Sequence, residues 1–320
     1  MAVGLIPVID AAETRAALPF DALIAALRSA FAGATVVPER HHHHIHRPGG
    51  EDGTLLLMAA WTDRLLGTKI ASIYPGNGRR GLPSVHSNYL LADVATGAPL
   101  ALIDGDQITK RRTIAGSALA ASFLAPDDAD TLLIVGAGQI GALAAEAFAA
   151  VRPIRRVMVW NRDAVKAAAL AGDLAAQGYA ATPVTALDAA VAEADIISCA
   201  TPSTAPIIRG EWLRAGTHLD LIGSFTPAMR EADDTCFARG RLYVDVREAL
   251  AEAGDLIDPI AHGVIDGDDV LGTLADLCTG RVAGRAAADD ITLYKSVGTA
   301  LADLAAAALV YARHAGDDHV

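Results

Sequence analysis

The pattern of apolar and polar positions divides the chain into two regions with different predicted structures. In the first third, segments rich in apolar and β-branched residues alternate with loops that contain Asp, Gly and Pro, which is typical of strands and turns. The predicted strands span 54–61, 67–74 and 84–93, and a helix over 20–33 precedes them. Apolar residues at helical spacing over 109–124 predict a further helix that links this sheet to the second region.

From residue 130 onward the chain alternates between buried strands and helices. The predicted strands span 131–135, 156–160, 196–200, 217–222, 242–246 and 291–294, and an Ala-rich helix over 298–313 follows the last of them. Such alternation is typical of an open parallel sheet with helices on both faces. The predicted fold class is therefore α/β, with a Rossmann-type doubly wound parallel sheet and a second, α+β domain.

Composition and charge exclude several classes of protein. Of the 320 residues, 52% are hydrophobic and 20% are charged, which excludes a disordered chain. No apolar run reaches the ~18 residues that span a bilayer, and the net charge of -12 repels nucleic acid and anionic membrane surfaces alike. Cys199, Cys236 and Cys278 show neither disulfide nor metal spacing, and residues 1–10 lack the features of a secretory signal. We therefore expect a soluble, cytoplasmic protein with no nucleic-acid or membrane partner.

A glycine motif in the second region predicts a dinucleotide site. Gly136, Gly138 and Gly141 follow a buried strand and precede a helix, and this GxGxxG spacing brings backbone N–H groups to a pyrophosphate. At the end of the next strand, where an acid would bind the ribose of NADH, stand Asn161 and Arg162. An Arg there accommodates a 2′-phosphate, so the pattern favours NADPH, with NADH as the alternative cofactor. Asp163, which follows, would be the ribose-binding acid in that alternative.

Isolated basic residues in the first region are candidates for binding an anionic substrate. Lys69 lies in a strand whose neighbours are of buried types, and a buried Lys needs an anionic partner, so it is a candidate carboxylate ligand or acid/base residue. Arg111 and Arg112 open the linking helix, and a guanidinium can bind a carboxylate with two hydrogen bonds. Arg40 precedes a run of histidines over 41–46. Because side chains alternate in direction along a strand, at most half of these histidines converge, and we expect no metal site.

Six stretches of the chain, in order, resemble the ornithine cyclodeaminase/mu-crystallin family. They are KIASIYPGNGRRGLPS from Lys69, TGAPLALIDG from Thr96, RTIAGSALA from Arg112, GAGQIG from Gly136, GSFTPAMRE from Gly223 and KSVGTA from Lys295. The resemblance covers nearly the whole chain. It implies a substrate-binding and dimerisation domain over 1–118, completed by a helix over 298–320, and an NAD(P)-binding Rossmann domain over 119–297. It also implies a homodimer whose first domains join their sheets.

Within that family, the stretch that begins at Gly223 distinguishes the activities. Ornithine cyclodeaminases carry a catalytic Asp in a Gly-Gly-Asp-Cys-Pro stretch, and this chain has Phe225 at that position. The chain therefore looks like the bacterial members that reduce Δ1-pyrroline-2-carboxylate to L-proline and Δ1-piperideine-2-carboxylate to L-pipecolate with NAD(P)H. The alternatives are an ornithine cyclodeaminase, which is an ammonia lyase, an alanine-dehydrogenase-like amino acid dehydrogenase, and a non-catalytic NADPH-binding protein like mu-crystallin.

The resemblance also implies roles for individual residues. Arg40, Lys69 and Arg112 would bind the carboxylate of a cyclic imino acid, and Lys69 would be the catalytic residue that orients or protonates the imine nitrogen. Arg47, in a loop over 47–53, competes with Arg40 for its place. The glycine motif and the resemblance together assign cofactor binding to residues after strand ends or at the domain junction: Ser84, Arg112, Gly136, Gly138, Gln139, Ile140, Gly141, Asn161, Arg162, Thr201, Ile222, Gly223, Ser224, Phe225 and Val297.

Overall fold

Two units, each built on its own sheet, make up the chain. The computed structural model describes residues 5–316. Unit 1 runs up to Arg112 and resumes at Thr299, and unit 2 spans Thr113–Gly298. The first boundary lies inside a helix, α3 (Gly105–Leu124), so this helix contributes residues to both units.

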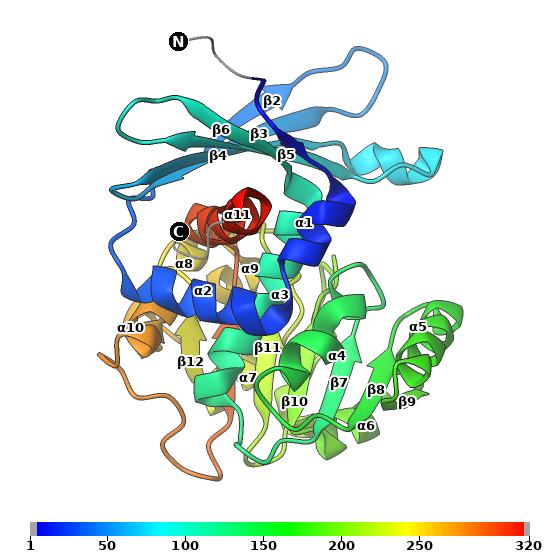
Figure 1. Ribbon diagram of the computed structural model, residues 1–320. Coiled ribbons are helices and arrows are strands. Elements are labelled where there is room, and N and C mark those ends of the chain that lie inside the picture. Colours follow the sequence, from blue (N-terminus) through cyan, green and yellow to red (C-terminus); the bar gives the residue numbers. More distant parts are fainter. Residues whose placement is uncertain (1–4, 317–320) are drawn as a thin grey trace. The chain divides into compact units, whose positions relative to one another are not determined.

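Unit 1 is built on a six-stranded sheet in the order β1-β6-β5-β4-β3-β2. Its strands are β1 (Val8–Ile9), β2 (His41–Ile45), β3 (Gly53–Trp61), β4 (Leu65–Ile73), β5 (Val85–Asp93) and β6 (Pro99–Asp104). Its other elements are α1 (Ala11–Ala17), α2 (Phe20–Ala32), the 3-10 helix η1 (Pro75–Arg80) and α11 (Ala300–Ala315). Strands β2 to β6 are antiparallel neighbours, whereas β1 pairs in parallel with β6. Helix α11 packs against β3, β4 and β5, and α2 packs against α11 on the same side of the sheet (Figure 1).

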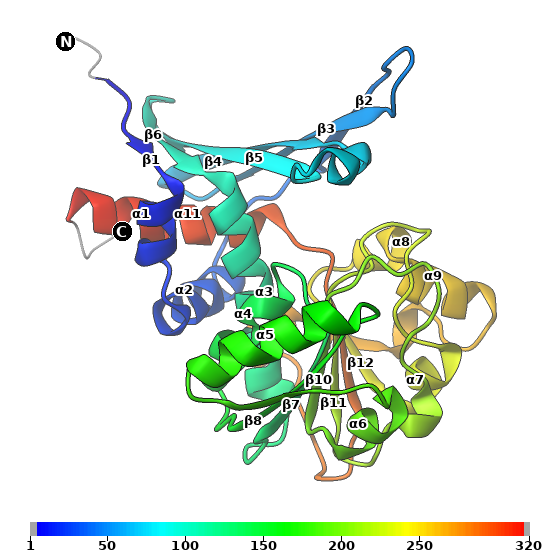
Figure 2. The same ribbon diagram turned by 90° about the vertical axis from the view of Figure 1, so that its right-hand side faces the viewer.

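The two faces of this sheet have different surroundings. In β4, Gly67, Lys69 and Ala71 are buried beneath α11, whereas the alternate residues point to the opposite side, which we call the outer face. The strand register places further apolar side chains on the outer face: Leu55, Leu57, Leu66, Ile70, Leu90, Leu100 and Leu102. Among the residues that the structure describes, no helix covers this face (Figure 2). Unit 1 therefore presents an apolar sheet surface without a second layer.

Unit 2 is built on an eight-stranded parallel sheet in the order β13-β12-β14-β11-β10-β7-β8-β9. Its strands are β7 (Thr131–Val135), β8 (Arg156–Trp160), β9 (Ala180–Pro183), β10 (Ile196–Cys199), β11 (His218–Leu221), β12 (Arg241–Val244), β13 (Val270–Thr273) and β14 (Thr292–Lys295). Its helices, besides its part of α3, are α4 (Gly141–Ala149), α5 (Ala164–Ala176), α6 (Leu187–Glu193), α7 (Asp234–Arg239), α8 (Ala249–Glu252), α9 (Gly254–Ala261) and α10 (Leu274–Cys278), with 3-10 turns η2 (Gly210–Trp212) and η3 (Gly267–Asp269).

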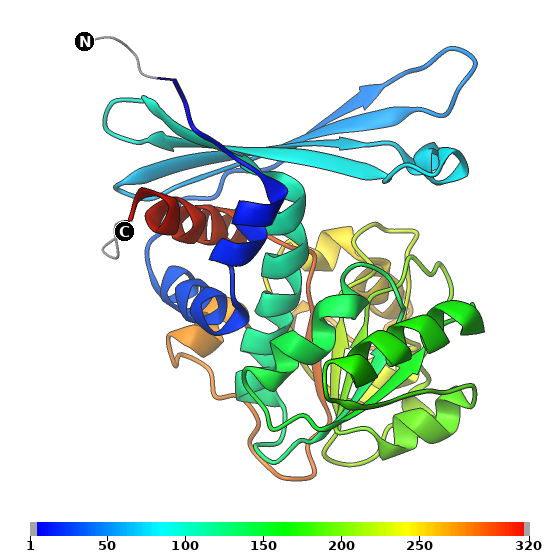
Figure 3. The same ribbon diagram turned by 45° about the vertical axis from the view of Figure 1, so that its right-hand side comes forward.

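The topology of unit 2 is that of a doubly wound fold. Within this sheet, the chain first forms β7 and then adds β8 and β9 on one side of it. It then returns to form β10 on the other side of β7, and helices cover both faces of the sheet (Figure 3). All five residues of β7 are buried, as expected for a strand covered on both faces. The reversal of strand order between β7 and β10 is the point where such sheets bind ligands. The predicted fold class is confirmed.

The main correction to the predicted elements concerns the linking helix. Helix α3 begins at Gly105 instead of residue 109, because the Asp104 carboxylate accepts a hydrogen bond from the Gln107 N–H (2.7 Å). Arg111 and Arg112 therefore lie inside the helix and do not open it. None of the described helices is both long and apolar enough to cross a membrane.

Candidate active site

Three charged side chains of unit 1 form a buried cluster. Lys69 Nζ lies 2.8 Å from Oδ2 of Asp303, and Arg112 Nε lies 2.8 Å from Oδ1 of the same carboxylate. Lys69 is 4% exposed, Arg112 7% and Asp303 0%. The structure thus brings together the two cations that the sequence assigned to the substrate, and joins them through an Asp that the sequence analysis did not identify.

Each member of the cluster comes from a different element of unit 1. Lys69 lies at the centre of β4, between Met58 on β3 and Tyr89 on β5, so neighbouring strands hold its backbone on both sides. Arg112 is carried by α3, and Asp303 lies in the first turn of α11, whose N-cap is Thr299. Because a strand and two helices must pack together to form it, the cluster depends on long-range contacts.

The start of α3 is fixed on the sheet, which sets the position of Arg112. The Asp106 carboxylate accepts hydrogen bonds from the N–H and the hydroxyl of Ser87 on β5, both at 2.8 Å. Arg111 has a different role from its neighbour, because its Nε donates to the Leu18 carbonyl (2.6 Å) and its guanidinium lies 4.1 Å from the centre of the Phe20 ring. Arg111 therefore holds the N-terminal helices, whereas Arg112 contacts Asp303.

The charges of the cluster shift the pKa values of its members. Burial, followed by the charge of Arg112 and to a smaller extent that of Arg40, lowers the pKa of Lys69 to about 8, against the opposing effect of Asp303. Burial acts to raise the pKa of Asp303, but Arg112 and Lys69 outweigh it and hold the pKa below its usual value. Two cations therefore contact one carboxylate. The excess positive charge suits an additional anionic group.

The alternative cation and the histidine run lie elsewhere in unit 1. The Arg47 guanidinium faces the Tyr74 ring at 5.8 Å, and its backbone N–H donates to Asp52 (2.9 Å). Of the two candidates, Arg40 is the one whose charge acts on Lys69. On β2, the exposed rings of His41 and His43 stack with centroids 6.4 Å apart. Within residues 5–316, no three His, Cys, Asp or Glu side chains are grouped closely enough to hold a metal ion.

The glycine motif of unit 2 forms a tight turn between β7 and α4. Gly136 has φ of 113°, and a Cβ there would lie 2.7 Å from the Ala200 carbonyl oxygen. A Cβ on Gly141 would collide with the Gly136 carbonyl oxygen, whereas a Cβ on Gly138 would meet nothing within 4 Å. The outer side of the turn is therefore open and the backbone at Gly138 is accessible, as a pyrophosphate at the start of α4 requires. The turn fits a dinucleotide.

The residues after β8 contact this turn and start the next helix. The Asn161 side chain accepts a hydrogen bond from the Ala137 N–H (3.2 Å) and donates one to the Asp163 carbonyl (3.1 Å). The Asp163 carboxylate caps α5 by accepting from the Val165 N–H (3.0 Å), so it already has a structural role. Arg162, which stands between them, is exposed.

The remaining candidate cofactor residues occupy loops in both units. Those of unit 2 lie at the helix start or after the ends of β10, β11 and β14: Gln139, Ile140, Thr201, Ile222, Gly223, Ser224, Phe225 and Val297. Ser224 is fully buried, whereas Phe225 is 50% exposed. Ser84 is exposed and belongs to unit 1, as does Arg112.

Sequence analysis missed Asp303 because nothing adjacent to it indicated chemistry. It lies four positions after the N-cap Thr299, in a helix of Ala and Leu whose inward face is otherwise apolar. An Asp on the buried face of an apolar helix requires a cationic partner. That signal was present in the sequence, but it did not indicate which cation would be the partner.

Comparisons with known proteins identify the family of the chain. A model of the ornithine cyclodeaminase/mu-crystallin family matches residues 9–318. A Δ1-pyrroline-2-carboxylate reductase of Paracoccus denitrificans is 42% identical over 265 residues, which cover 82% of this chain and 84% of the relative. The structure of the Thermococcus litoralis Δ1-pyrroline-2-carboxylate reductase with NADH and L-proline superposes with a TM-score of 0.91 at 32% identity, covering 98% of this chain and 99% of that one. An archaeal alanine dehydrogenase dimer with bound NAD gives a TM-score of 0.90 at 27% identity, covering 97% of each chain. The chain therefore belongs to the ornithine cyclodeaminase/mu-crystallin family.

Proposed function

We propose that the protein reduces cyclic ketimines with NAD(P)H, converting Δ1-pyrroline-2-carboxylate to L-proline and Δ1-piperideine-2-carboxylate to L-pipecolate. The observation that carries this proposal is the buried cluster in which Lys69 and Arg112 share the single carboxylate of Asp303. Arg40, Lys69 and Arg112 bind the substrate carboxylate, which compensates the excess positive charge of the cluster. Lys69 is the catalytic residue. The relatives that are Δ1-pyrroline-2-carboxylate reductases act on a substrate with a carboxylate beside a C=N bond, which fits a site of this charge.

Lys69 has the properties of a proton donor to the imine nitrogen. With a pKa of about 8 it is mostly protonated at neutral pH, yet it gives up a proton more readily than an ordinary Lys. Moving that proton to the nitrogen makes an iminium whose C2 accepts hydride, and leaves a neutral amine in a buried site that disfavours charge. Hydride is available from the nicotinamide ring when a reduced dinucleotide is bound. No carboxylate at the position of Phe225 is required for these steps.

The two units have different proposed functions. We assign substrate binding and dimerisation to unit 1, and NAD(P) binding to the glycine turn and the neighbouring loops of unit 2. The chain has three free cysteines, and we place the protein in the cytoplasm, where thiols stay reduced.

The test is direct reduction of a chemically prepared imine. We expect Δ1-pyrroline-2-carboxylate to cause oxidation of NADPH or NADH, followed by cofactor absorbance. Ornithine with NAD serves as a parallel assay for released ammonia, and pyruvate with ammonia and NADH tests the amino acid dehydrogenase suggested by the similarity to the archaeal alanine dehydrogenase. Ammonia release from ornithine without imine reduction would refute the proposal and the significance given to Phe225.

Arg162 is proposed to select NADPH. An exposed guanidinium after β8 can pair with a 2′-phosphate, whereas the Asp163 carboxylate is engaged in capping α5. We expect Arg162→Ala to raise the KM for NADPH about tenfold, the loss of one charge-assisted interaction, and to leave the KM for NADH within about twofold. Steady-state kinetics with both cofactors measure this. Equal effects on the two cofactors would show that Arg162 does not contact the 2′-phosphate.

We also propose that two copies associate through the outer face of unit 1. This face carries apolar side chains on four strands and has no covering layer among the described residues, and one structural relative is a dimer. Ile70, which is 39% exposed, lies on this face. Light scattering should give about twice 33.0 kDa for the unmodified chain and about 33.0 kDa for Ile70→Lys. Val165→Lys, at a position 77% exposed in unit 2, is the control. A dimer that persists in Ile70→Lys would place the interface elsewhere.

A further inference from the structure

A buried carboxylate in unit 2 joins two of the candidate cofactor loops. Glu231 is 0% exposed. Its Oε1 accepts hydrogen bonds from the N–H (2.7 Å) and the hydroxyl (2.9 Å) of Thr201, and its Oε2 accepts one from the Gly223 N–H (2.7 Å). Thr201 follows β10 and Gly223 follows β11, which are neighbouring strands of the sheet. One side chain therefore connects the loops at the carboxyl ends of two strands.

The two loops pack against each other and against the glycine turn. A Cβ on Gly223 would collide with the backbone of Thr201, so only glycine allows this approach. A Cβ on Gly136, in the glycine turn, would lie 3.0 Å from the Thr201 methyl group. Thr201 thus touches both the turn after β7 and the loop after β11. A shift of Thr201 would be transmitted to both.

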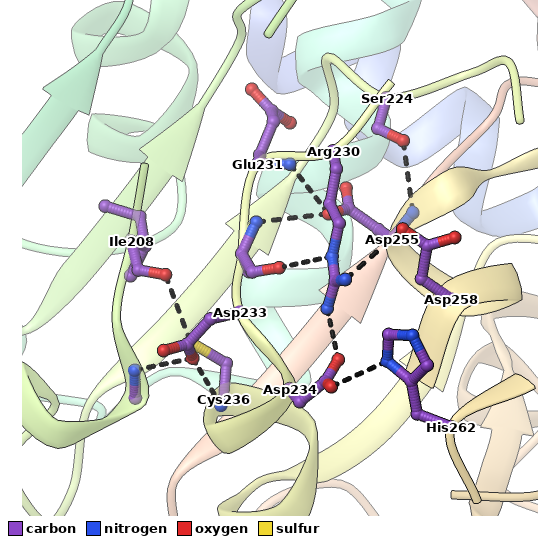
Figure 4. A network of polar contacts seen from close by, with 12 residues as sticks. Ile208, Ser224, Arg230, Glu231, Asp233, Asp234, Cys236, Asp255, Asp258 and His262 are labelled. Carbon is purple, nitrogen blue, oxygen red and sulfur yellow. Dashed lines mark hydrogen bonds and ion pairs between the residues drawn. The ribbon is translucent and has the colours of Figure 1, made fainter. Parts of the chain in front are cut away.

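A second layer of buried charges holds Glu231 in place. The Asp255 carboxylate accepts from the backbone N–H groups of Glu231 (2.8 Å) and Ala232 (3.1 Å), and its other oxygen lies 3.1 Å from Nζ of Lys295. Asp255 and Lys295 are both fully buried. Figure 4 shows Asp255 beneath the Glu231 backbone, with the neighbouring Arg230 extended toward acids on α7 and α9. The Glu231 backbone is thus held by Asp255, and its carbonyl also accepts from the N–H groups of Ile207 (2.8 Å) and Ile208 (2.9 Å) in the loop after β10.

The neighbouring residue fixes the same segment on its other side. The Arg230 guanidinium pairs with Asp234 of α7 and with Asp258 of α9 (3.2 Å), and its Nε donates to the Ala232 carbonyl (3.0 Å). These contacts bind the backbone of the segment to two helices. The Arg230 backbone N–H also donates to the Ser203 carbonyl in the loop after β10 (2.7 Å), so the Glu231 side chain adds its bonds to Thr201 and Gly223 to an existing backbone connection.

We propose that Glu231 is a positioning residue for dinucleotide binding, which holds the loops after β10 and β11 at the spacing that the cofactor requires. The inference rests on the proposed function only in that unit 2 binds NAD(P). All three groups directed at the carboxylate are donors, so it must act as an acceptor on both oxygens. A glutamine has one oxygen, and its NH2 group would face an N–H of one loop. Glu231→Gln therefore disrupts one connection while it preserves size and shape.

The experiment measures cofactor binding directly, without substrate. NADPH is titrated into the unmodified protein, Glu231→Gln and the control Glu211→Gln, and the cofactor fluorescence gives each dissociation constant. Glu211 lies on η2, with its side chain 66% exposed, so its replacement makes the same charge change in the same unit at the surface. We expect Glu231→Gln to raise the dissociation constant about tenfold or more, and Glu211→Gln to change it by less than about twofold.

A milder variant and a kinetic measurement separate positioning from a general loss of structure. Thr201→Val keeps the side-chain shape and the N–H, and removes only the hydroxyl donor, so it should raise the dissociation constant by less than Glu231→Gln does. At saturating NADPH, the KM of Glu231→Gln for the imine should stay within about twofold of the unmodified value. If Glu231→Gln folds and binds NADPH as tightly as the unmodified protein, the inference is overturned. If Glu231→Gln fails to fold, an unchanged dissociation constant for NADPH in Thr201→Val overturns it instead. Tight NADPH binding without turnover of any imine would refute the proposed function alone.

Discussion

Replacing Lys69 with Met should lower kcat/KM for Δ1-pyrroline-2-carboxylate about a thousandfold. General acid catalysis by a positioned side chain contributes about a hundredfold to ten-thousandfold, and the substitution also removes one of the cations that bind the substrate carboxylate. Methionine fills similar space without charge, and it leaves the 2.8 Å contact between Arg112 and Asp303 in place. Steady-state kinetics at saturating cofactor measure the effect.

The control for this variant is cofactor binding. Lys69 belongs to unit 1, and the glycine turn belongs to unit 2, so the dissociation constant for NADPH should change by less than about twofold. Activity that remains within about tenfold of the unmodified protein would mean that another group, or water, protonates the imine. Lys69 would then be a binding residue only.

The pH dependence of the reaction should carry the signature of the same group. The pKa of Lys69 is lowered to about 8, mainly by burial, so the ammonium form is present below that pH and is lost above it. In the direction of imine reduction, kcat/KM should therefore fall as the pH rises through about 8. Because the charge of Arg40 contributes to lowering this pKa, Arg40→Ala should move the alkaline fall to higher pH. An alkaline limb that does not move in this variant would show that Lys69 is not the titrating group.

Some parts of the fold are well predicted by patterns in the sequence, and the structure explains why. Strands β7 and β8 have the predicted bounds, because each is short, apolar and flanked by turn residues, and the glycine motif locates the turn after β7. Strand β13 (Val270–Thr273) was not predicted, because it lies in a Gly/Asp-rich stretch and pairs only through a shifted register with β12. Strand β6, which begins with Pro99, was not predicted either. Local signals are weak where pairing depends on neighbours that are distant in the sequence.

The candidate site shows the same division between local and long-range information. Lys69 and Arg112 were recognisable as cations in apolar segments, because their burial without a partner would cost energy. Their shared partner Asp303 lies 191 positions after Arg112 and can be assigned only when α11 is placed on the sheet. Glu231 was part of a recognised motif, but its function depends on the side-by-side arrangement of β10 and β11. Sequence therefore indicated the cations, and the structure supplied the carboxylate that they share.

Replacing Asp303 with Ala should destabilise the protein by about 3 to 5 kcal/mol. The substitution leaves Lys69 and Arg112 buried without their carboxylate, and loss of one partner of a buried pair has an effect of about this size because the remaining charge is uncompensated. Asp303→Asn keeps the volume and one acceptor oxygen, so it should destabilise the protein less. The free energy of unfolding in urea at neutral pH measures both, and Asp188→Ala, at an exposed position of α6, should change it by less than about 0.5 kcal/mol.

The same variants should change the chemistry through Lys69. The charge of Asp303 raises the pKa of Lys69 against the effect of burial, so its removal lowers that pKa further. In Asp303→Asn the ammonium form is then lost at a lower pH, and the alkaline fall in kcat/KM should move below about 8, opposite to the shift expected for Arg40→Ala. The combination Lys69→Met with Asp303→Asn removes one charge of each sign, and it should be destabilised by less than the sum of the two single variants because they share a contact. Additive effects on stability would contradict the ion pair, and an unchanged pH profile in Asp303→Asn would remove Asp303 from the control of Lys69.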